Sequence, residues 1–173
     1  LLLFIPLFLV RRLLQIMVNY VTRLKKGDKA PDFKGKDQNG NLVVLSSFKG
    51  KKLIIFFYPK DNTPACTAQA CNLRDNYAAL KKKGYTIVGI SADDAKMHKK
   101  FSDKYQLPFS LIVDTDKKII EAYDVWGEKK FMGRTFDGIN RTTFVIDEEG
   151  IIEKIILNVK TKSHTEQILE TGL

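Results

Sequence analysis

The sequence predicts an α/β protein with a central mixed sheet and helices on both faces. Apolar runs typical of buried strands alternate along the chain with amphipathic stretches typical of helices, and a hairpin signal stands at each end of this alternating part. The chain has 173 residues, which suits one domain with enough apolar content to bury a core.

Each element rests on a local pattern. The Asn39-Gly40 pair predicts a tight hairpin turn, residues 53–58 are apolar throughout, and the spacing of Cys66, Ala70 and Leu73 predicts a helix face. In chain order we expect a hairpin (31–33 and 42–45), a helical turn (46–50), a strand (53–58), a helix (66–80), a strand (86–91), a helix (95–105), a strand (111–113), a short helix (119–123), an irregular loop (124–140), a hairpin (142–147 and 151–159) and a final helix (165–171). This order fits a thioredoxin-like fold with an N-terminal β-hairpin.

The positive charge is concentrated in the first third of the chain. The formal net charge is +9, and residues 1–60 hold 12 Lys and Arg against 3 Asp and Glu, whereas residues 61–173 hold 17 of each. Charge alone would permit nucleic-acid binding. Because the sequence contains no zinc-finger, helix-turn-helix or interleaved aromatic and basic motif, we expect scattered lysines that solvate a surface and no nucleic-acid partner.

Residues 1–18 form an apolar extension that we separate from a domain at 19–173. The extension carries Pro6 and the pair Arg11-Arg12, and its longest apolar run is about half of the roughly 20 residues that span a bilayer. It also lacks the order of regions of a signal peptide. We expect Met17 to be the natural start, residues 1–16 to be an extension of the gene model, and the protein to be cytoplasmic. A membrane-surface anchor is the competing interpretation.

The segment 59–71 holds both cysteines, Cys66 and Cys71. Two cysteines exclude a disulfide-rich scaffold. The two histidines, His98 and His164, lie far from them in sequence and at no usual zinc spacing, and we expect both to be exposed. The sequence therefore predicts neither a metal site nor a cofactor.

Cys66 follows a predicted buried strand and lies in the first turn of a predicted helix. Backbone N–H groups and the helix dipole at that end favour the thiolate. The hydroxyl of Thr63 can bond the sulfur or a bound oxygen, and Pro59 and Pro64 rigidify the turn. Such a thiolate can attack a peroxide O–O bond and become a sulfenic acid. The alternative is a pair of buried structural thiols.

Cys71 lies five residues after Cys66. In an intact helix their Cα atoms are about 8.5 Å apart, and a disulfide needs less than about 7 Å. A bond between them therefore requires the first helical turns to unwind. The spacing also differs from the Cys-x-x-Cys of simple disulfide exchange enzymes.

These residues resemble a known family. The pattern Pro59-x-x-x-Thr63-x-x-Cys66 is similar to the active-site motif of peroxiredoxins, and the segments 58–71, 125–133 and 138–144 resemble the bacterioferritin-comigratory (Q-type) subfamily. The resemblance covers roughly residues 24–171. It implies a thioredoxin-like fold and an antioxidant enzyme that reduces hydrogen peroxide and organic hydroperoxides. Ala65 departs from the subfamily, which commonly has glycine there.

The resemblance also implies a role for each site residue. Cys66 would be the peroxidatic cysteine and Cys71 the resolving one, joined within one chain. Thr63 would hydrogen-bond the thiolate and the peroxide, Arg141 would stabilise both, and Pro59 would shield the pocket. The reductant would be thioredoxin or a similar dithiol, and such proteins are often monomers that need no metal.

Three alternatives remain open at this point. Oxidation of Cys66 could serve a peroxide sensor of low turnover, in which the helix changes a partner surface. A membrane-associated thiol protein would rest on residues 1–18 alone. Arg141 could be an ordinary strand-edge arginine, and Trp126 and Phe131 are expected to pack within the loop.

Overall fold

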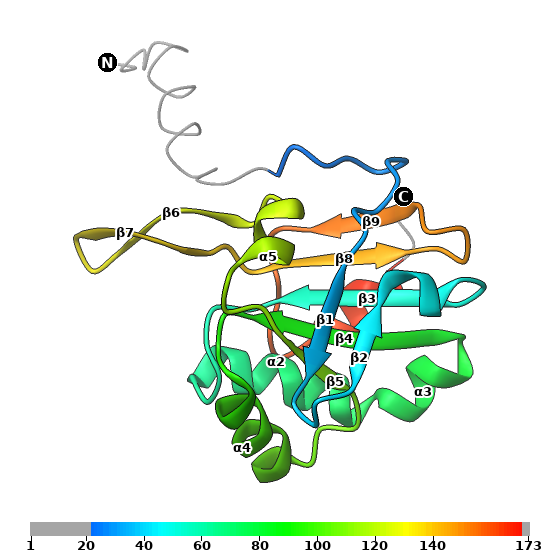
Figure 1. Cartoon of the computed structure of the whole chain (residues 1–173), viewed down its shortest axis with the longest axis horizontal. Coiled ribbons are helices and arrows are strands. Elements are labelled where there is room, and N and C mark those ends of the chain that lie inside the picture. Colours follow the sequence, from blue (N-terminus) through cyan, green and yellow to red (C-terminus); the bar gives the residue numbers. More distant parts are fainter. Residues whose placement is uncertain (1–21, 171–173) are drawn as a thin grey trace, which may run out of the picture.

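The computed structural model describes residues 22–170, and their centre is a seven-stranded sheet (Figure 1). The strand order is β2-β1-β5-β4-β3-β8-β9. The strands are β1 (Lys34–Asp37), β2 (Leu42–Val44), β3 (Lys52–Phe57), β4 (Tyr85–Ser91), β5 (Ser110–Val113), β8 (Thr142–Ile146) and β9 (Ile152–Ile156). Strands β3, β4 and β5 run parallel, and β8 pairs antiparallel with β3. The predicted mixed sheet and N-terminal hairpin are therefore confirmed, but the first strand of that hairpin covers Lys34–Asp37 and not residues 31–33. The apolar extension lies outside the described residues.

Helices cover both faces of the sheet, as predicted, but unequally. They are α2 (Pro64–Asp75), α3 (Tyr77–Lys82), α4 (Ala95–Tyr105), α5 (Lys118–Ala122) and α6 (His164–Leu169), with a 3-10 turn at Leu45–Phe48. Buried residues of α2, α3, α4 and α6 share one core cluster, and those of α5 belong to the other. The cysteine helix thus lies on the thicker side of a thioredoxin-like sandwich.

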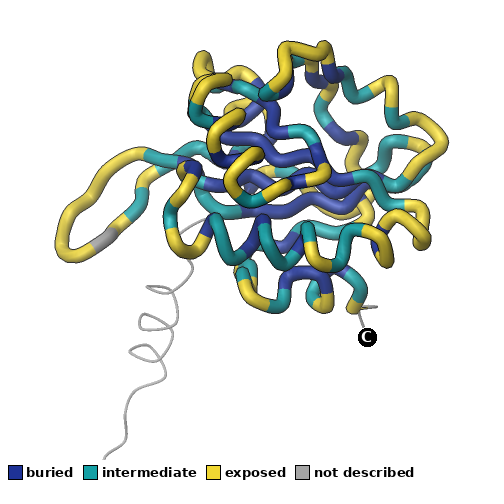
Figure 2. The backbone as a smooth tube through the Cα atoms, turned by 90° about the horizontal axis from the view of Figure 1, so that it is seen from below, coloured by how far each residue is buried: buried dark blue, intermediate teal, exposed yellow. Residues whose placement is uncertain are grey.

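Strand β3 divides the core because successive side chains of a strand point to opposite faces. Leu53, Ile55 and Phe57 pack in the cluster on the α5 side, and Ile54 and Phe56 pack in the cluster that contains Cys66. All five are at most 1% exposed, and the buried strands lie in the middle of the molecule in Figure 2. Apolar residues on both faces are typical of an interior strand, and β3 lies between β4 and β8.

The helix expected over residues 66–80 is two helices. Helix α2 ends at Asp75 and α3 begins at Tyr77, with Asn76 between them at φ −104° and ψ 9°. The Asn76 side-chain amide donates to the carbonyl oxygen of Asn72 at 2.8 Å. An asparagine side chain that bonds the backbone in this way competes with the helical hydrogen bonds. The helical spacing of apolar residues continues past Asn76, so the spacing alone does not reveal that the helix breaks there.

The loop expected at 124–140 is instead a β-hairpin. Strands β6 (Trp126–Phe131) and β7 (Arg134–Ile139) pair antiparallel, and Figure 1 shows them projecting from the body. Met132 and Gly133 both have positive φ, 49° and 75°, as a two-residue type I′ turn requires. The prediction failed because charged residues and glycines fill these strands without apolar alternation. Trp126 does pack, with the ammonium of Lys117 4.9 Å from its ring centre.

Asparagine 72 ties α2 to the C-terminal helix α6. Its Oδ1 accepts hydrogen bonds from the backbone N–H of Thr165 at 2.8 Å and from the Thr165 hydroxyl at 2.9 Å. Its side-chain amide donates to the carbonyl oxygen of Lys162 at 3.0 Å. The second half of α2 is therefore anchored beside Cys71.

Both histidines are buried, so the expectation of exposed histidines is wrong. His98 and His164 each have no exposed surface. His164 meets the hydroxyl of Thr143 through Nε2 at 2.9 Å and the Gln167 side chain through Nδ1 at 3.1 Å. Each ring has partners from distant segments, which the sequence around it does not show.

No helix within residues 22–170 is both long and apolar enough to cross a bilayer. The cytoplasmic location expected from the sequence stays a prediction.

Acid should destabilise the fold through His164. Burial, the largest cause, lowers the pKa of His164 to about 4; the Gln167 hydrogen bond opposes this and the charge of Arg141 adds to it. The unfolded chain, with a histidine pKa of about 6.5, then binds more protons between those values, so stability falls as the pH drops through this window. We expect this to remove about 2 to 3 kcal/mol between pH 7 and pH 4.5.

Urea unfolding of the wild type and of His164→Asn at both pH values measures this effect. The variant should lose less stability than the wild type over the same interval. An equal loss in the two proteins would contradict the assignment.

Candidate active site

Cys66 lies at the start of α2, where β3 has ended and the chain turns back. Thr63 precedes the helix in an extended conformation and Pro64 is its first residue. The Thr67 N–H closes the first helical hydrogen bond on the carbonyl of Thr63 at 2.9 Å. Cys66 is therefore in the first turn, as predicted, at the positive end of the helix dipole. It is a free thiol and only 2% exposed.

Arg141 contacts the Cys66 sulfur directly. It precedes β8, and the pairing of Phe57 with Thr142 places it beside the end of β3. Its Nη2 lies 3.1 Å from Sγ of Cys66. A guanidinium at this distance stabilises a negative charge on the sulfur, so the predicted pairing of these two residues is found in the fold.

Gln69 orients that arginine, although it was not among the site residues predicted from the sequence. It stands three residues after Cys66 on the same helix face, it is fully buried, and its Oε1 accepts a hydrogen bond from Nη1 of Arg141 at 2.6 Å. Its Nε2 has no hydrogen-bond partner among residues 22–170. The i, i+3 spacing within the motif was the one signal that pointed to it.

Thr63 has a different partner from the expected one. Its hydroxyl donates to the carbonyl oxygen of Lys60 at 2.9 Å. A hydroxyl has one proton to donate, so in this conformation it closes the turn before the helix and donates nothing to the sulfur. Pro59 stands two residues after the end of β3 and is half-buried. Its shielding role stays a prediction.

Lys129 brings a second positive charge from the β6–β7 hairpin. Its Nζ donates to the carbonyl oxygen of Ile139 at 2.8 Å. Burial lowers the pKa of Lys129, the charge of Arg141 lowers it further, and Cys66 raises it. The Lys129 ammonium therefore interacts electrostatically with both Arg141 and Cys66. Its sequence context predicts an irregular loop, and the pairing of β6 with β7 is what brings Lys129 near the site.

Cys71 is a free thiol on the same helix, half-buried and one turn beyond Cys66. Helix α2 runs unbroken from Pro64 to Asp75. Regular helix geometry places the two Cα atoms about 8.5 Å apart, beyond the reach of a disulfide. The structure therefore holds the reduced, helical state of the cysteine pair.

The two cysteines and the two histidines do not come together as a zinc site in the described part of the chain. Both ring nitrogens of His98 and of His164 have hydrogen-bond partners other than cysteine. Within residues 22–170, the group that could offer ligand atoms to a cation is a different one, Asp61, Asp93 and His98, whose ligand atoms lie within 4.8 Å of one another.

This geometry defines a class of protein. A buried thiol at a helix N-terminus, paired with an arginine on a thioredoxin-like scaffold, suits nucleophilic redox chemistry at sulfur. The AhpC/TSA family model matches residues 26–155.

Proteins of one group within that family are similar over most of their length. The chain is 47% identical to peroxiredoxin Bcp of Escherichia coli K12 over 146 residues, covering 84% of this chain and 94% of the relative. It is 45% identical to peroxiredoxin Bcp of Bacillus subtilis, covering 84% and 92%. A peroxiredoxin Q structure from Xanthomonas campestris superposes with a TM-score of 0.77 at 32% identity, covering 86% and 94%. The chain therefore belongs to the AhpC/TSA family, in its Bcp (PrxQ) group of peroxiredoxins.

Removing the charge of Arg141 should make Cys66 less nucleophilic. In a Cys71→Ser background we expect Arg141→Gln to slow alkylation of Cys66 by iodoacetamide at pH 6.5 roughly tenfold, the size of one charge-assisted hydrogen bond. Mass spectrometry of the alkylated peptide measures the rate. Arg134→Gln, on the exposed hairpin, is the matched control, and an equal effect in both variants would contradict the assignment.

Lys129 should act at longer range and therefore more weakly. We expect Lys129→Met to slow the same alkylation about two- to threefold at low ionic strength and less at high salt, because the effect is a screened charge interaction. Lys130→Met is the control, since Lys130 is the exposed neighbour. A loss that salt does not change would rule out a through-space effect.

Proposed function

We propose that Cys66 is the peroxidatic cysteine of this peroxiredoxin and that the protein reduces hydrogen peroxide and organic hydroperoxides. The observation that carries the assignment is the 3.1 Å contact between Arg141 and Sγ of Cys66. The thiol and the cation come from segments 75 residues apart and meet where the helix dipole adds a second favourable charge. The Xanthomonas campestris bacterioferritin comigratory protein, 32% identical with a TM-score of 0.76, has alkyl peroxide reduction activity.

In the first step the Cys66 thiolate attacks the terminal oxygen of the hydroperoxide. An S–O bond forms, the O–O bond breaks, and the departing hydroxide or alkoxide takes a proton to become water or alcohol. The sulfur is oxidised to a sulfenic acid. Arg141 faces the reacting sulfur and can stabilise the charge that develops on the peroxide oxygens. Thr63 would need to turn its hydroxyl away from Lys60 to bond the substrate, and Pro59 shields the sulfur from water.

In the second step the thiol of Cys71 displaces water from the sulfenic acid and forms an intramolecular disulfide with Cys66. Because both residues lie in one intact helix, this step needs the first turns of α2 to unwind. A dithiol reductant, which we take to be thioredoxin, then reduces the disulfide through a mixed-disulfide intermediate. Because both cysteines belong to one chain, this disulfide needs no second subunit, and we take the protein to work as a monomer.

The cysteine pair should separate the two steps. Cys66→Ser should abolish hydroperoxide consumption in an assay coupled to thioredoxin, thioredoxin reductase and NADPH. Cys71→Ser should consume about one equivalent of hydroperoxide per protein and then stop, because the sulfenic acid has no resolving thiol. Sustained turnover in Cys66→Ser would contradict the peroxidatic role, and full cycling in Cys71→Ser would contradict the resolving role. Sustained turnover in the wild type also separates a peroxidase from a sensor that reacts once per signal.

A further inference from the structure

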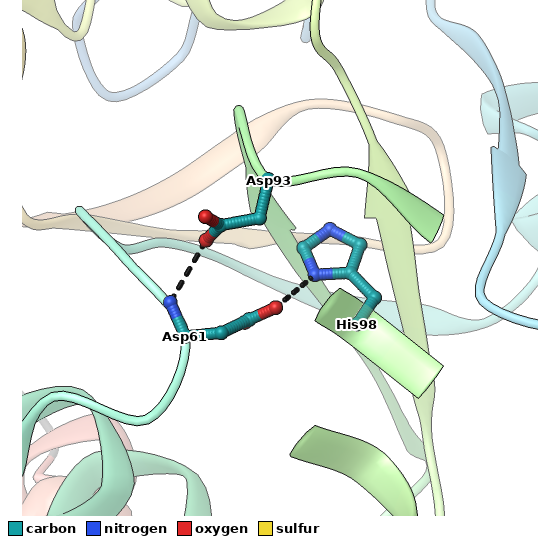
Figure 3. A group of neighbouring side chains, drawn as sticks. All are labelled: Asp61, Asp93 and His98. Atoms are coloured by element: carbon teal, nitrogen blue, oxygen red, sulfur yellow. Dashed lines mark hydrogen bonds and ion pairs between the residues drawn. The ribbon is translucent and has the colours of Figure 1, made fainter. Parts of the chain in front are cut away.

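A buried polar cluster holds the loop that leads into the cysteine helix. Asp61 lies in this loop, and its side chain has no exposed surface. The Tyr58 hydroxyl donates to Oδ1 of Asp61 at 2.7 Å, and Nδ1 of His98 meets Oδ2 at 2.7 Å. Figure 3 shows His98 and Asp93 converging on Asp61 from two other segments of the chain. Both carboxylate oxygens therefore have close partners from rigid elements.

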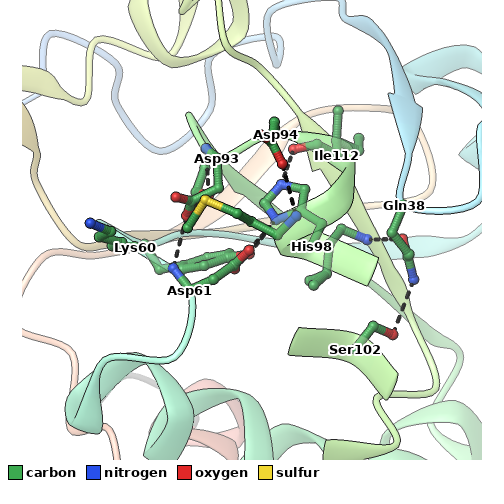
Figure 4. A network of polar contacts seen from close by, with 12 residues as sticks. Gln38, Lys60, Asp61, Asp93, Asp94, His98, Ser102 and Ile112 are labelled. Carbon is green, nitrogen blue, oxygen red and sulfur yellow. Dashed lines mark hydrogen bonds and ion pairs between the residues drawn. The ribbon is translucent and has the colours of Figure 1, made fainter. Parts of the chain in front are cut away.

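The backbone of the same residue is held as well. The Asp61 N–H donates to Oδ2 of Asp93 at 2.8 Å, and the Ser91 hydroxyl donates to the same oxygen at 2.9 Å. Asp93 follows β4, so this bond ties the loop to the end of the neighbouring parallel strand. Asp61 is thus fixed by its main chain and its side chain together (Figure 4).

The proton positions in this cluster follow from its partners. Nε2 of His98 lies 3.1 Å from the carbonyl oxygen of Ile112, and a carbonyl only accepts, so Nε2 carries a proton. One further proton lies between Nδ1 and Asp61. Burial, reinforced by the charge of Asp61, raises the pKa of Tyr58 well above its ordinary value, which keeps the phenol a donor. The Tyr58 hydroxyl and Nδ1 of His98 therefore each contact one oxygen of the Asp61 carboxylate.

A left-handed turn follows immediately. Asn62 has φ 58°, a conformation that asparagine adopts more readily than most non-glycine residues, and the Thr63 hydroxyl then donates to the carbonyl oxygen of Lys60. On the N-terminal side of Asn62 the chain is held by the contacts of Asp61. On the C-terminal side α2 begins two residues after Asn62.

We propose that Tyr58, Asp61, Asp93 and His98, which we call the Asp61 clamp, are positioning residues that keep the start of α2 wound and hold Cys66 against Arg141. The proposal rests on the proposed function, in which the same turns must unwind to form the disulfide. The clamp then favours the first step and opposes the second. Loosening it should slow oxidation of Cys66 by peroxide and speed formation of the Cys66–Cys71 disulfide. A sulfenic acid that is resolved sooner is also less exposed to further oxidation to sulfinic acid.

The fold supplies a matched pair of variants. Tyr58 and Tyr123 are both fully buried tyrosines, on opposite sides of the sheet. The Tyr58 hydroxyl donates to Asp61, and the Tyr123 hydroxyl donates to the carbonyl of Pro31 at 2.9 Å. Replacing either with Phe removes one buried hydroxyl, and the two changes differ in whether the clamp is affected.

Stopped-flow measurements should then follow both steps in Tyr58→Phe and Tyr123→Phe. In Tyr58→Phe we expect a Cys66 oxidation rate several-fold lower, a disulfide formation rate several-fold higher, and a smaller sulfinic fraction at high peroxide, consistent with loss of one hydrogen bond to a charged group. In Tyr123→Phe both rates should stay within twofold of the wild type. Rates that change in the same direction in Tyr58→Phe, or equally in both variants, would overturn the clamp.

A second readout needs no catalysis. In the reduced protein, amide hydrogen exchange over residues 61–70 should be faster in Tyr58→Phe than in Tyr123→Phe. Unchanged exchange there would refute the clamp even if the peroxidase cycle is established, and faster exchange would support it even if the disulfide never forms.

A bound cation is the competing explanation of the Asp61, Asp93 and His98 group. Thermal unfolding of the Cys66→Ser, Cys71→Ser protein with one equivalent of Zn²⁺ tests it without the thiols as ligands. We expect no change in Tm. A rise that His98→Gln abolishes would overturn the clamp in favour of a metal site.

Discussion

The contact between the Arg141 guanidinium and the Cys66 sulfur is the interaction on which the site depends. It joins the start of a helix to the start of a strand 75 residues later, and it forms only because β3 and β8 pair in the register that sets Phe57 beside Thr142. The sheet therefore positions the Arg141 guanidinium, and α2 positions the Cys66 thiol at the positive end of the helix dipole. Gln69 holds the guanidinium in place from within α2.

Charge around the sulfur comes from three separate parts of the fold. Besides Arg141 and the helix terminus, the β6–β7 hairpin contributes Lys129, whose half-buried ammonium is anchored on the carbonyl of Ile139. The hairpin projects from the body (Figure 1). Its base carries Lys129 near the sulfur, and its tip lies in solvent, with Met132 86% exposed. Strong fields at small buried sites are commonly assembled in this way from distant groups.

The sequence predicted the features that depend on local pattern. The apolar run of β3, the turn at Asn39-Gly40 and the place of Cys66 in the first turn of a helix were foreseen, although that helix was expected over 66–80 and begins at Pro64. Arg141 was named through the family resemblance alone. The errors came where a distant or polar partner decides the outcome. Asn76 breaks a helix through its own amide, the charged strands of the hairpin lack apolar alternation, and the burial of His98 depends on Asp61, 37 residues earlier in the chain. The hydroxyl of Thr63 donates to the carbonyl oxygen of Lys60 and not to the sulfur.

The anchoring of Asn72 on α6 limits how far any rearrangement of the cysteine helix can spread. Its three hydrogen bonds to Lys162 and Thr165 lie immediately after Cys71, and the break at Asn76 separates α3 from α2. An unwound segment whose far end is tethered explores few conformations, so it gains little chain entropy. For the same reason the helix re-forms by a local rearrangement. The order–disorder transition that we propose for disulfide formation is thus confined to about two turns of helix, and the strands of the sheet lie outside it.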